Sequence, residues 1–388
     1  MLVFGWRTAV LALVSAQVLI LAAALWGAPQ NRAANRRLAA LLVVLVGLVT
    51  PYTLGFAGFY DAYPWLTFAP FAAPLAVGPL ALGYVRAWTG EPLRPPLWAH
   101  LIPAAAQFVY GAVCFALPMP AKAAWADGGH EAIEPVLALA APLSLAAYAG
   151  AALASLRHYR RRLGEVVSDE ARFALGWLGR ALIALTLTLA VWAAMQTWEV
   201  AAAGLTYFQR LGLYLAIAAL ALYLGIEGWR HAGLRRPALD GPAPAQEALG
   251  EAGETGDTAR RDWRATGAAW AAQVDAAGWW REPDLTLAEL AARLGTNTHY
   301  LSRALNEGLG QNFASFVNGR RAAAVRARLE AGDGRGLLEL AFEAGFNSKA
   351  SFNRAYAAAF GESPSAARRR GSEAKLRAGF PETGRAPS

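Results

Sequence analysis

Hydrophobic and polar residues are distributed unevenly along the 388 residues of the chain. Long apolar runs follow one another over residues 8–230, whereas residues 236–388 show the mixed pattern of a soluble protein. A bilayer core about 30 Å thick requires roughly 20 apolar residues per helix. The pattern therefore predicts an all-α chain in which residues 1–236 form a seven-helix transmembrane bundle. The seven runs lie at 8–27, 37–59, 65–88, 97–117, 134–156, 174–197 and 207–229.

The cations between these runs indicate an orientation, because Lys and Arg near the ends of membrane spans stay on the cytoplasmic side. With the N-terminus outside, 14 of the 17 Lys and Arg residues before residue 237 lie on the cytoplasmic side. Arg32, Arg36 and Arg37 directly follow the first run, which argues against a cleaved signal peptide, since such a peptide has its charges in front. We expect a multi-pass protein of the bacterial inner membrane whose C-terminal part is cytoplasmic.

Prolines interrupt the third run at Pro64, Pro70, Pro74 and Pro79. Proline removes a helix hydrogen bond, so we expect this helix to be kinked or locally broken. A broken helix at membrane depth is tolerated where it lines protein or a wet cavity. The aromatic residues around it fit either a belt at the membrane surface or the mouth of a pocket for a small-molecule or lipid signal. They are Tyr52, Phe56, Phe59, Tyr60, Tyr63, Trp65 and Phe68.

The polar residues within the apolar runs also allow two interpretations. They either line a signal-binding cavity, or join helices and lie at the membrane surface; they are Gln17, His100, Gln107, Gln196 and Glu199. The single cysteine, Cys114, lies within an apolar run and has no second thiol with which to bind a metal. We expect no metal site, no cofactor and no enzymatic activity. The alternative, a transporter or intramembrane enzyme with a regulatory tail, has no catalytic motif to support it.

Two segments lack the apolar residues that a core requires. Residues 237–262 are rich in Pro and Gly, and we expect a disordered linker that spans on the order of 25–30 Å. Residues 371–388 are expected to form a flexible tail. The linker would also permit proteolytic release of the C-terminal part.

A repeated segment marks the soluble part of the chain. Residues 289–295 (ELAARLG) recur at 339–345 (ELAFEAG) with an offset of 50, and Leu301-Ser302-Arg303 matches Phe352-Asn353-Arg354 with an offset of 51. A unit of this length that occurs twice indicates a duplicated small helical module.

Each copy has the capping and helix-terminating residues that are typical of a helix-turn-helix. In the first, Thr286 and Glu289 form a capping box, Gly295 ends that helix, and Asn297 is a good N-cap for a helix over 298–307. In the second, Gly345 and Asn347 are expected to play the same parts before a helix from Ser348 to Phe360. A helix over 313–330 joins the copies. We expect its apolar side chains to point inward and its arginines mostly outward; these are Phe313, Phe316, Val317, Val325 and Leu329, and Arg320, Arg321, Arg326 and Arg328.

These residues resemble the AraC-type transcription regulators. The second copy, AFEAGFNSKASFNR at 341–354 followed by FGESP at 360–364, is similar to the family signature almost throughout, and the first copy agrees at Tyr300-Leu301-Ser302-Arg303. The resemblance covers the predicted domain at 263–370 and implies that the second helix of each copy lies in the major groove. The implied DNA-binding residues are His299, Ser302, Arg303 and Asn306 in the first copy, and Lys349, Ser351, Asn353 and Arg354 in the second.

The charge of this domain is modest. Residues 281–370 hold 13 Lys and Arg against 9 Asp and Glu, a net charge of +4. Because phosphate contacts dominate non-specific affinity, we expect weak, salt-limited binding by one copy of the domain, offset by dimerisation in the membrane. The resemblance thus implies a membrane-bound transcription regulator controlled by an unknown signal, with double-stranded DNA, the lipid bilayer, a second copy of the chain and RNA polymerase as partners.

Overall fold

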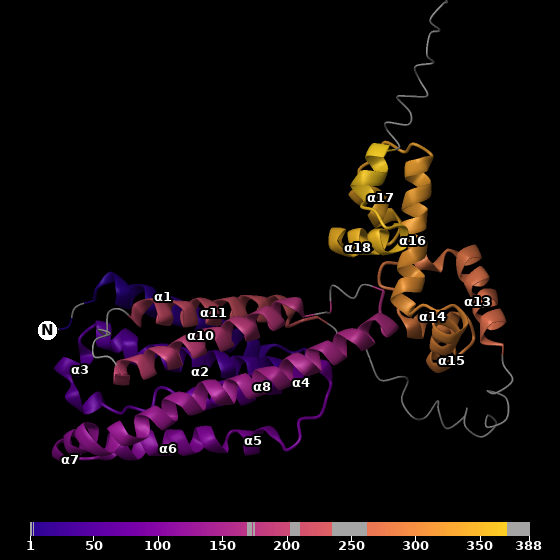
Figure 1. The fold of residues 1–388 in the computed structure, drawn as a ribbon. Helices are drawn as coiled ribbons and strands as arrows, with labels where there is room; N and C mark the ends of the chain where they lie inside the picture. The colour runs from indigo at the N-terminus through magenta and orange to yellow at the C-terminus, as the bar shows by residue number, and fades with distance from the viewer. Residues whose placement is uncertain are drawn as a thin grey trace, which may run out of the picture. The chain divides into compact units, whose positions relative to one another are not determined.

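The computed structural model describes residues 2, 4–168, 173, 175–201, 210–234 and 262–370. In this part of the chain every regular element is a helix (Figure 1). The chain forms two compact units, Met1–Arg157 with Leu175–Arg236, and His158–Ala174 with Pro237–Ser388. Apart from Asp262, the expected linker at 237–262 lies outside the described residues, as does the expected tail at 371–388.

The first unit is built from apolar helices. Four helices are long and apolar enough to cross a membrane, namely Trp6–Gly27, Arg32–Phe56, Leu139–Val166 and Leu211–His231, and two shorter apolar helices cover Ile102–Ala116 and Gly176–Trp192. The count of seven spans stays a prediction. The helices of this unit are α1 (Trp6–Gly27), α2 (Arg32–Phe56), α3 (Phe59–Ala62), α4 (Val77–Thr89), α5 (Leu97–His100), α6 (Ile102–Ala116), α7 (Met119–Ala124), α8 (Glu131–Val166), α10 (Gly176–Ala201) and α11 (Leu211–His231).

The proline-rich third run is broken, as its sequence predicts. Pro64 and Pro74 each begin a short 3-10 turn, and regular helix starts only at Val77. The amide of Leu75, next to the break, donates to Oε1 of Gln107 at 3.4 Å. Gln107 therefore joins α6 to the broken segment, which supports the interpretation of this glutamine as a link between helices.

The fifth run forms a longer helix than the hydrophobic pattern predicts. Its apolar residues end at 156, but α8 continues through Arg157 and Arg160 to Val166. At 1.5 Å per residue its 36 residues extend about 54 Å, well beyond a bilayer core of about 30 Å. Packing supports this continuation, because Tyr159 is 3% exposed and Leu163 is fully buried.

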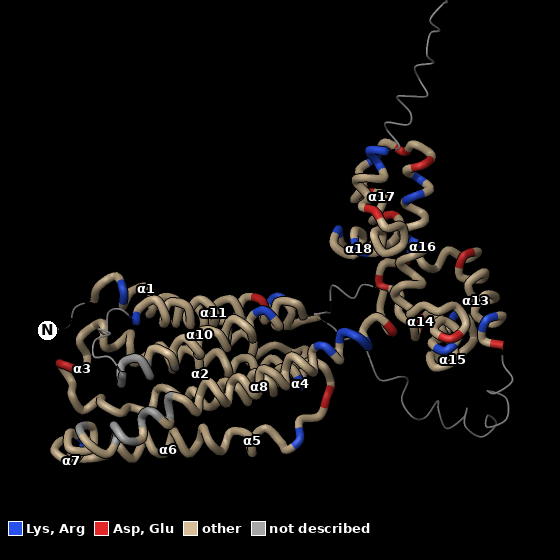
Figure 2. Tube along the Cα trace, viewed as in Figure 1, with Lys and Arg blue, Asp and Glu red and all other residues tan. Residues whose placement is uncertain are grey.

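Small residues allow the helices of the first unit to approach closely. A Cβ at Gly228 of α11 would overlap the side chain of Leu38 of α2, and one at Gly225 would lie 2.9 Å from Leu21 of α1. Outward-facing side chains are apolar as well, with Leu13 62% and Ile20 69% exposed. Figure 2 shows few charged residues along these helices between their ends. Close approach at glycine and apolar outer faces are typical of helices packed in lipid.

Two polar side chains buried in the first unit have backbone partners. Asn35 is fully buried, and its amide nitrogen donates to the carbonyls of Gln30 and Ala232. Lys122 is 3% exposed, and its ammonium donates to the carbonyl of Trp65 at 2.9 Å. Lys122 lies between the fourth and fifth apolar runs, and the chain folds back there to supply a carbonyl acceptor.

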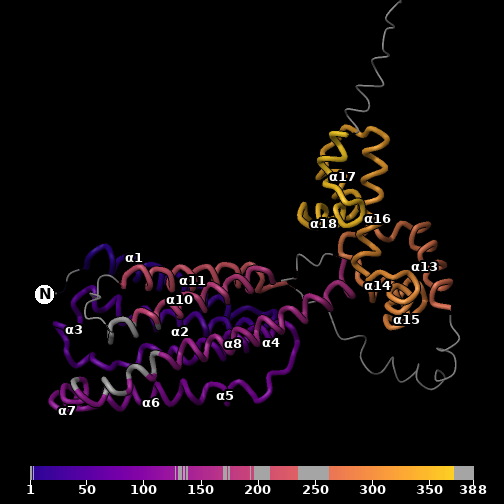
Figure 3. The backbone as a smooth tube through the Cα atoms, viewed as in Figure 1, coloured from indigo at the N-terminus to yellow at the C-terminus, as the bar shows by residue number. Residues whose placement is uncertain are grey.

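Figure 3 shows the described helices of the second unit arranged along one long helix, α16. Their buried side chains form two small cores. The first core includes Phe313, Phe316 and Val317 from the N-terminal half of α16, and the second includes Ala322 and Val325 from its C-terminal half. The helices are α13 (Trp263–Ala277), α14 (Leu287–Arg293), α15 (Thr298–Arg303), α16 (Phe313–Glu330), α17 (Leu337–Glu343) and α18 (Lys349–Phe360), with a π-helical turn η7 (Ala304–Gly308) after α15.

Several local predictions for this unit are confirmed. Thr286 and Glu289 form the capping box, and Asn297 caps α15 by accepting from the amide of Tyr300. Gly295 and Gly345 have φ of 66° and 93°, the left-handed region in which glycine is not strained. The connecting helix begins and ends where the pattern places it, at Phe313 and Glu330.

Two predictions are wrong. Asn347 does not cap the second recognition helix: Ser348 does, accepting from the amide of Ser351, because the turn of the second copy is one residue longer. Arg321 does not point outward: it is 1% exposed. Helical periodicity places Arg321 on the face between the two cores, and carbonyl groups from a distant loop fill its hydrogen-bonding positions.

Candidate nucleic-acid interface

The first candidate recognition helix is α15 with the turn η7. Its apolar residues Leu301 and Leu305 are 1% exposed and belong to the first core. This packing turns the opposite face outward, where His299 and Asn306 are exposed and Ser302 is half-buried. The amide of Asn306 donates to Oγ of Ser302 at 3.2 Å. Three of the four predicted residues of this copy therefore lie on one polar face.

Arg303, the fourth, already has intramolecular partners. Its Nε donates to Oε1 of Glu307 at 2.9 Å, and its guanidinium carbon lies 4.7 Å from the ring centre of Trp263. The hydrogen bond to Arg303 lowers the pKa of Glu307, and the same bond raises the pKa of Arg303. A DNA contact by Arg303 thus competes with a carboxylate. The spacing of four residues on a helix is a signal for this pair, whereas nothing local in the sequence indicates the contact with Trp263.

The second candidate recognition helix, α18, has a different arrangement. Phe352 and Tyr356 are buried in the second core, which turns Lys349, Asn353 and Arg354 outward as exposed residues. Within the described residues, no ion pair involves Lys349 or Arg354. Both cations are therefore available to an anionic ligand without prior loss of a carboxylate partner.

Ser351 is the predicted site residue that the structure turns inward. It is 7% exposed, and its hydroxyl accepts a hydrogen bond from Oγ of Ser348 at 3.1 Å. A side chain with so little accessible surface contributes to the cap of α18 and offers little to a base edge. Its role in DNA binding stays a prediction, and its burial argues against that role.

Seven of the 13 arginines in residues 262–370 form ion pairs with carboxylates, and Figure 2 shows basic and acidic residues interspersed along these helices. The pairs are Arg293–Glu282, Arg303–Glu307, Arg320–Asp275, Arg326–Glu330, Arg328–Asp333, Arg335–Asp333, Arg335–Glu343 and Arg370–Glu362. Pairing leaves the net charge of +4 unchanged, because the carboxylates are already counted in it, but each paired arginine attracts phosphate less strongly than an unpaired one.

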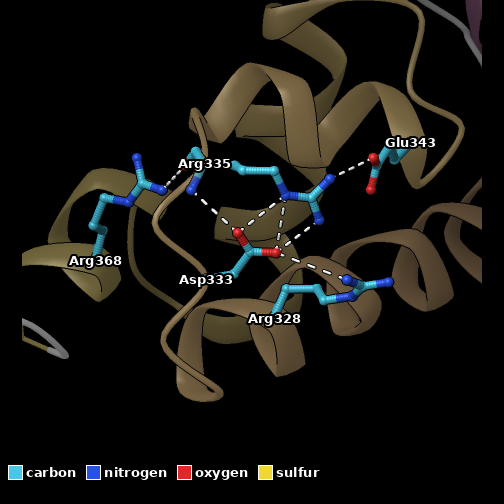
Figure 4. A network of polar contacts seen from close by, with 5 residues as sticks. All are labelled: Arg328, Asp333, Arg335, Glu343 and Arg368. Carbon is cyan, nitrogen blue, oxygen red and sulfur yellow. Dashed lines mark hydrogen bonds and ion pairs between the residues drawn. The ribbon is translucent and has the colours of Figure 1, made fainter.

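The densest of these ion-pair groups holds the turn between α16 and α17 (Figure 4). Asp333 accepts from the backbone amide and the guanidinium of Arg335, whose other nitrogen donates to Glu343. The bonds from Arg335 hold the pKa of Asp333 at about 2, below its usual value of 3.8. Arg368 donates to the carbonyl of Arg335. The group fixes the entry to α17, the first helix of the second helix-turn-helix.

Two capped helices with polar outer faces, each preceded by a short helix and joined by one long helix, define a tandem helix-turn-helix domain. Residues 290–370 match the family model described as a helix-turn-helix domain, which is of the AraC type. The match supports a DNA-binding transcription regulator, with DNA as partner. The comparisons with curated proteins and with solved structures gave no match to the chain.

Proposed function

We propose that this protein is a membrane-bound transcription regulator that binds promoter DNA in sequence-specific fashion through α15 and α18. The observation that supports this most directly is the pair of recognition helices within the matched region, each capped at its start and exposing polar side chains. The N-terminal turns of such helices face base edges in the major groove.

The two helices contribute unequally. In α18, Arg354 is exposed and suited to bidentate contact with guanine O6 and N7, and Lys349 offers a point charge near the start of the helix. In α15, His299, Ser302 and Asn306 supply donors and acceptors, while Arg303 must exchange Glu307 for DNA. We infer that α18 supplies the stronger contacts with DNA, including a base-specific one from Arg354, and that α15 adds further hydrogen bonds to base edges.

The apolar helices of the first unit support insertion into the inner membrane. The 14 cytoplasmic cations of the N-out arrangement favour a cytoplasmic position for residues 237–388. A second copy in the same membrane would raise the local concentration of recognition helices at paired DNA sites. A signal that acts on the membrane helices would change this pairing, and RNA polymerase would respond to the bound regulator.

Sequence-specific binding by the full-length protein in detergent micelles tests the proposal. Duplexes selected from a random library by the wild-type chain serve as the probe. Arg354→Ala is expected to weaken binding to the selected duplex by between about fivefold and about a hundredfold, the range for loss of one bidentate base contact. The matched control is Arg369→Ala, which removes the same charge from an exposed position outside α15 and α18.

Failure of the wild-type chain to enrich any sequence would contradict the proposed function. Equal losses in Arg354→Ala and Arg369→Ala would leave DNA binding in place but would remove α18 as the recognition helix. Membrane insertion is tested separately by resistance of the protein to extraction from bacterial membranes with alkaline carbonate.

A further inference from the structure

Arg321 is buried in the middle of the DNA-binding domain, and only 1% of its surface is exposed. Its guanidinium is held by three hydrogen bonds. Nε donates to the carbonyl of Trp280 at 2.7 Å, Nη2 to the carbonyl of Glu282 at 2.6 Å, and Nη1 to Oδ1 of Asn318 at 3.2 Å. Burial of a cation is costly unless its donors are satisfied. Arg321 therefore requires the surrounding acceptors to stay in place, a requirement that an exposed arginine does not have.

Arg321 lies on α16 between residues that belong to two different cores. The residues before it, Phe316 and Val317, pack in the core of the first helix-turn-helix, and the residues after it, Ala322 and Val325, pack in the core of the second. Arg321 therefore lies where the long helix passes from one core to the other. Its two carbonyl partners belong to residues 279–285, the segment that precedes the first helix-turn-helix.

The turn of the second helix-turn-helix meets the same segment. A Cβ at Gly345 would overlap the carbonyl of Arg281 and would lie 3.0 Å from Nε of Arg321. The guanidinium carbon of Arg321 is 5.9 Å from the ring centre of Phe346. Asn347 donates through its amide nitrogen to the carbonyl of Pro283 and to Oδ1 of Asp284. Glycine at 345 thus permits a close approach that Asn347 and Arg321 hold in place.

We propose that Arg321, with Asn347 and the segment 279–285, forms a clamp that fixes the separation and relative rotation of the two recognition helices. Arg321 is a positioning residue: it contacts no DNA but sets the geometry of α15 and α18. The inference rests on the proposed function for its consequence, the selection of DNA sites by spacing. The clamp itself is a property of the free protein.

Such a clamp has a physical reason. Of the described helices, only α16 contributes side chains to both cores. A connection through a single helix leaves the two cores free to rotate relative to each other. Two major-groove contacts on one face of DNA require a defined rotation between the two recognition helices. One added base pair rotates the second contact by about 35°. A forked guanidinium bound to two carbonyls of another segment restricts both translation and rotation, which a lysine ammonium does less well.

The first test measures the clamp without DNA. Full-length protein with Cys114→Ser carries spin labels at Ala292→Cys on α14 and Ala358→Cys on α18, both exposed positions, and electron–electron resonance gives the distance distribution. We expect a narrow distribution in this background, a broad one after Arg321→Met, and an intermediate one after Arg321→Lys. The control Arg320→Met removes the neighbouring arginine, which pairs with Asp275 on α13, and should leave the distribution narrow.

The second test uses duplexes selected by the wild-type chain, with one or two base pairs inserted between the two protected segments. Insertion should weaken wild-type binding roughly tenfold, because only one recognition helix then engages fully. In Arg321→Met the penalty should fall to about twofold or less, while affinity for a duplex with one protected segment stays unchanged. A merely destabilising substitution would lower affinity for all duplexes alike.

Should Arg321→Met fail to fold, Asn347→Ala provides the same tests, since its side chain is exposed. Narrow distance distributions in both variants would overturn the clamp, as would an unchanged insertion penalty. Absence of any selected DNA sequence would overturn the proposed function instead, and the distance measurement would still decide whether the clamp exists.

Discussion

The ion pair between Arg303 and Glu307 leads to the prediction that removing an acidic residue strengthens DNA binding. Glu307→Gln keeps the shape of the side chain and removes its charge. The substitution leaves Arg303 stacked on Trp263 but removes the charged partner, whose two oxygens lie 2.9 and 3.1 Å from Nε and Nη2. The amide oxygen of glutamine can accept only one of these two bonds, so one donor is freed. Since Arg303 lies on the first recognition helix, the freed donor is available to one phosphate or base edge.

The size of the effect follows from counterion release. One additional neutralised phosphate steepens the slope of log K against log salt concentration by about 0.9. If the variant and the wild type are equal near 1 M salt, where electrostatic attraction is screened, this slope amounts to about a fivefold gain in affinity near 0.15 M salt. In an Arg303→Ala background the gain from Glu307→Gln should be much smaller, because only the repulsion by the carboxylate is removed.

Fluorescence anisotropy with a labelled duplex, measured for both variants and their combination across a salt series, tests this reasoning. Glu339→Gln on α17 is the matched control, because it removes one negative charge from an exposed position outside the recognition helices. Equal gains with and without Arg303, or an equal gain in the control, would refute the argument, since net charge alone would then explain the affinity.

Two further predictions concern stability. Asp333→Asn should lower the thermal midpoint of the DNA-binding domain near neutral pH. The pKa of Asp333 in the folded protein is about 2, below its usual value of 3.8. The carboxylate therefore stabilises the fold above pH 3.8, and this contribution disappears as the pH falls through about 2. A calorimetric difference between variant and wild type that persists at pH about 2 would contradict this. Gly228→Val should destabilise the first unit by about 1–3 kcal/mol, because the added atoms overlap Leu38. In detergent its thermal aggregation should begin at a lower temperature than that of Gly212→Val, a position with no neighbour within 4 Å.

Much of the DNA-binding domain was predictable because its signals are local. The capping box at Thr286, the cap at Asn297 and the bounds of α16 depend on residues within one or two turns of each other. The Asn347 prediction failed for a local reason too: the second turn contains one more residue, so the cap moves to Ser348. The break in the third apolar run was predictable because proline acts on its own helix.

Contacts between distant segments were not predictable. The two carbonyl partners of Arg321 are 41 and 39 residues away along the chain. Trp263 is 40 positions before Arg303. The inward direction of Ser351 likewise depends on the packing of α18 against α16, not on residue type. The sequence therefore indicated the two helices that carry the eight predicted DNA-binding residues. The structure showed how these residues differ: Arg354 is exposed, Arg303 is paired and Ser351 is buried.

By itself, the sequence determined the apolar character of the first unit, the duplicated helix-turn-helix and the caps at Thr286 and Asn297, because hydrophobic periodicity and capping act over a few residues. Only the tertiary structure decided which cations are available to DNA and which are not. Availability depends on whether a carboxylate, a ring or a carbonyl from another segment reaches the side chain, and that is set by packing. The same packing places the buried Arg321 between the two cores, where a surface arginine was expected.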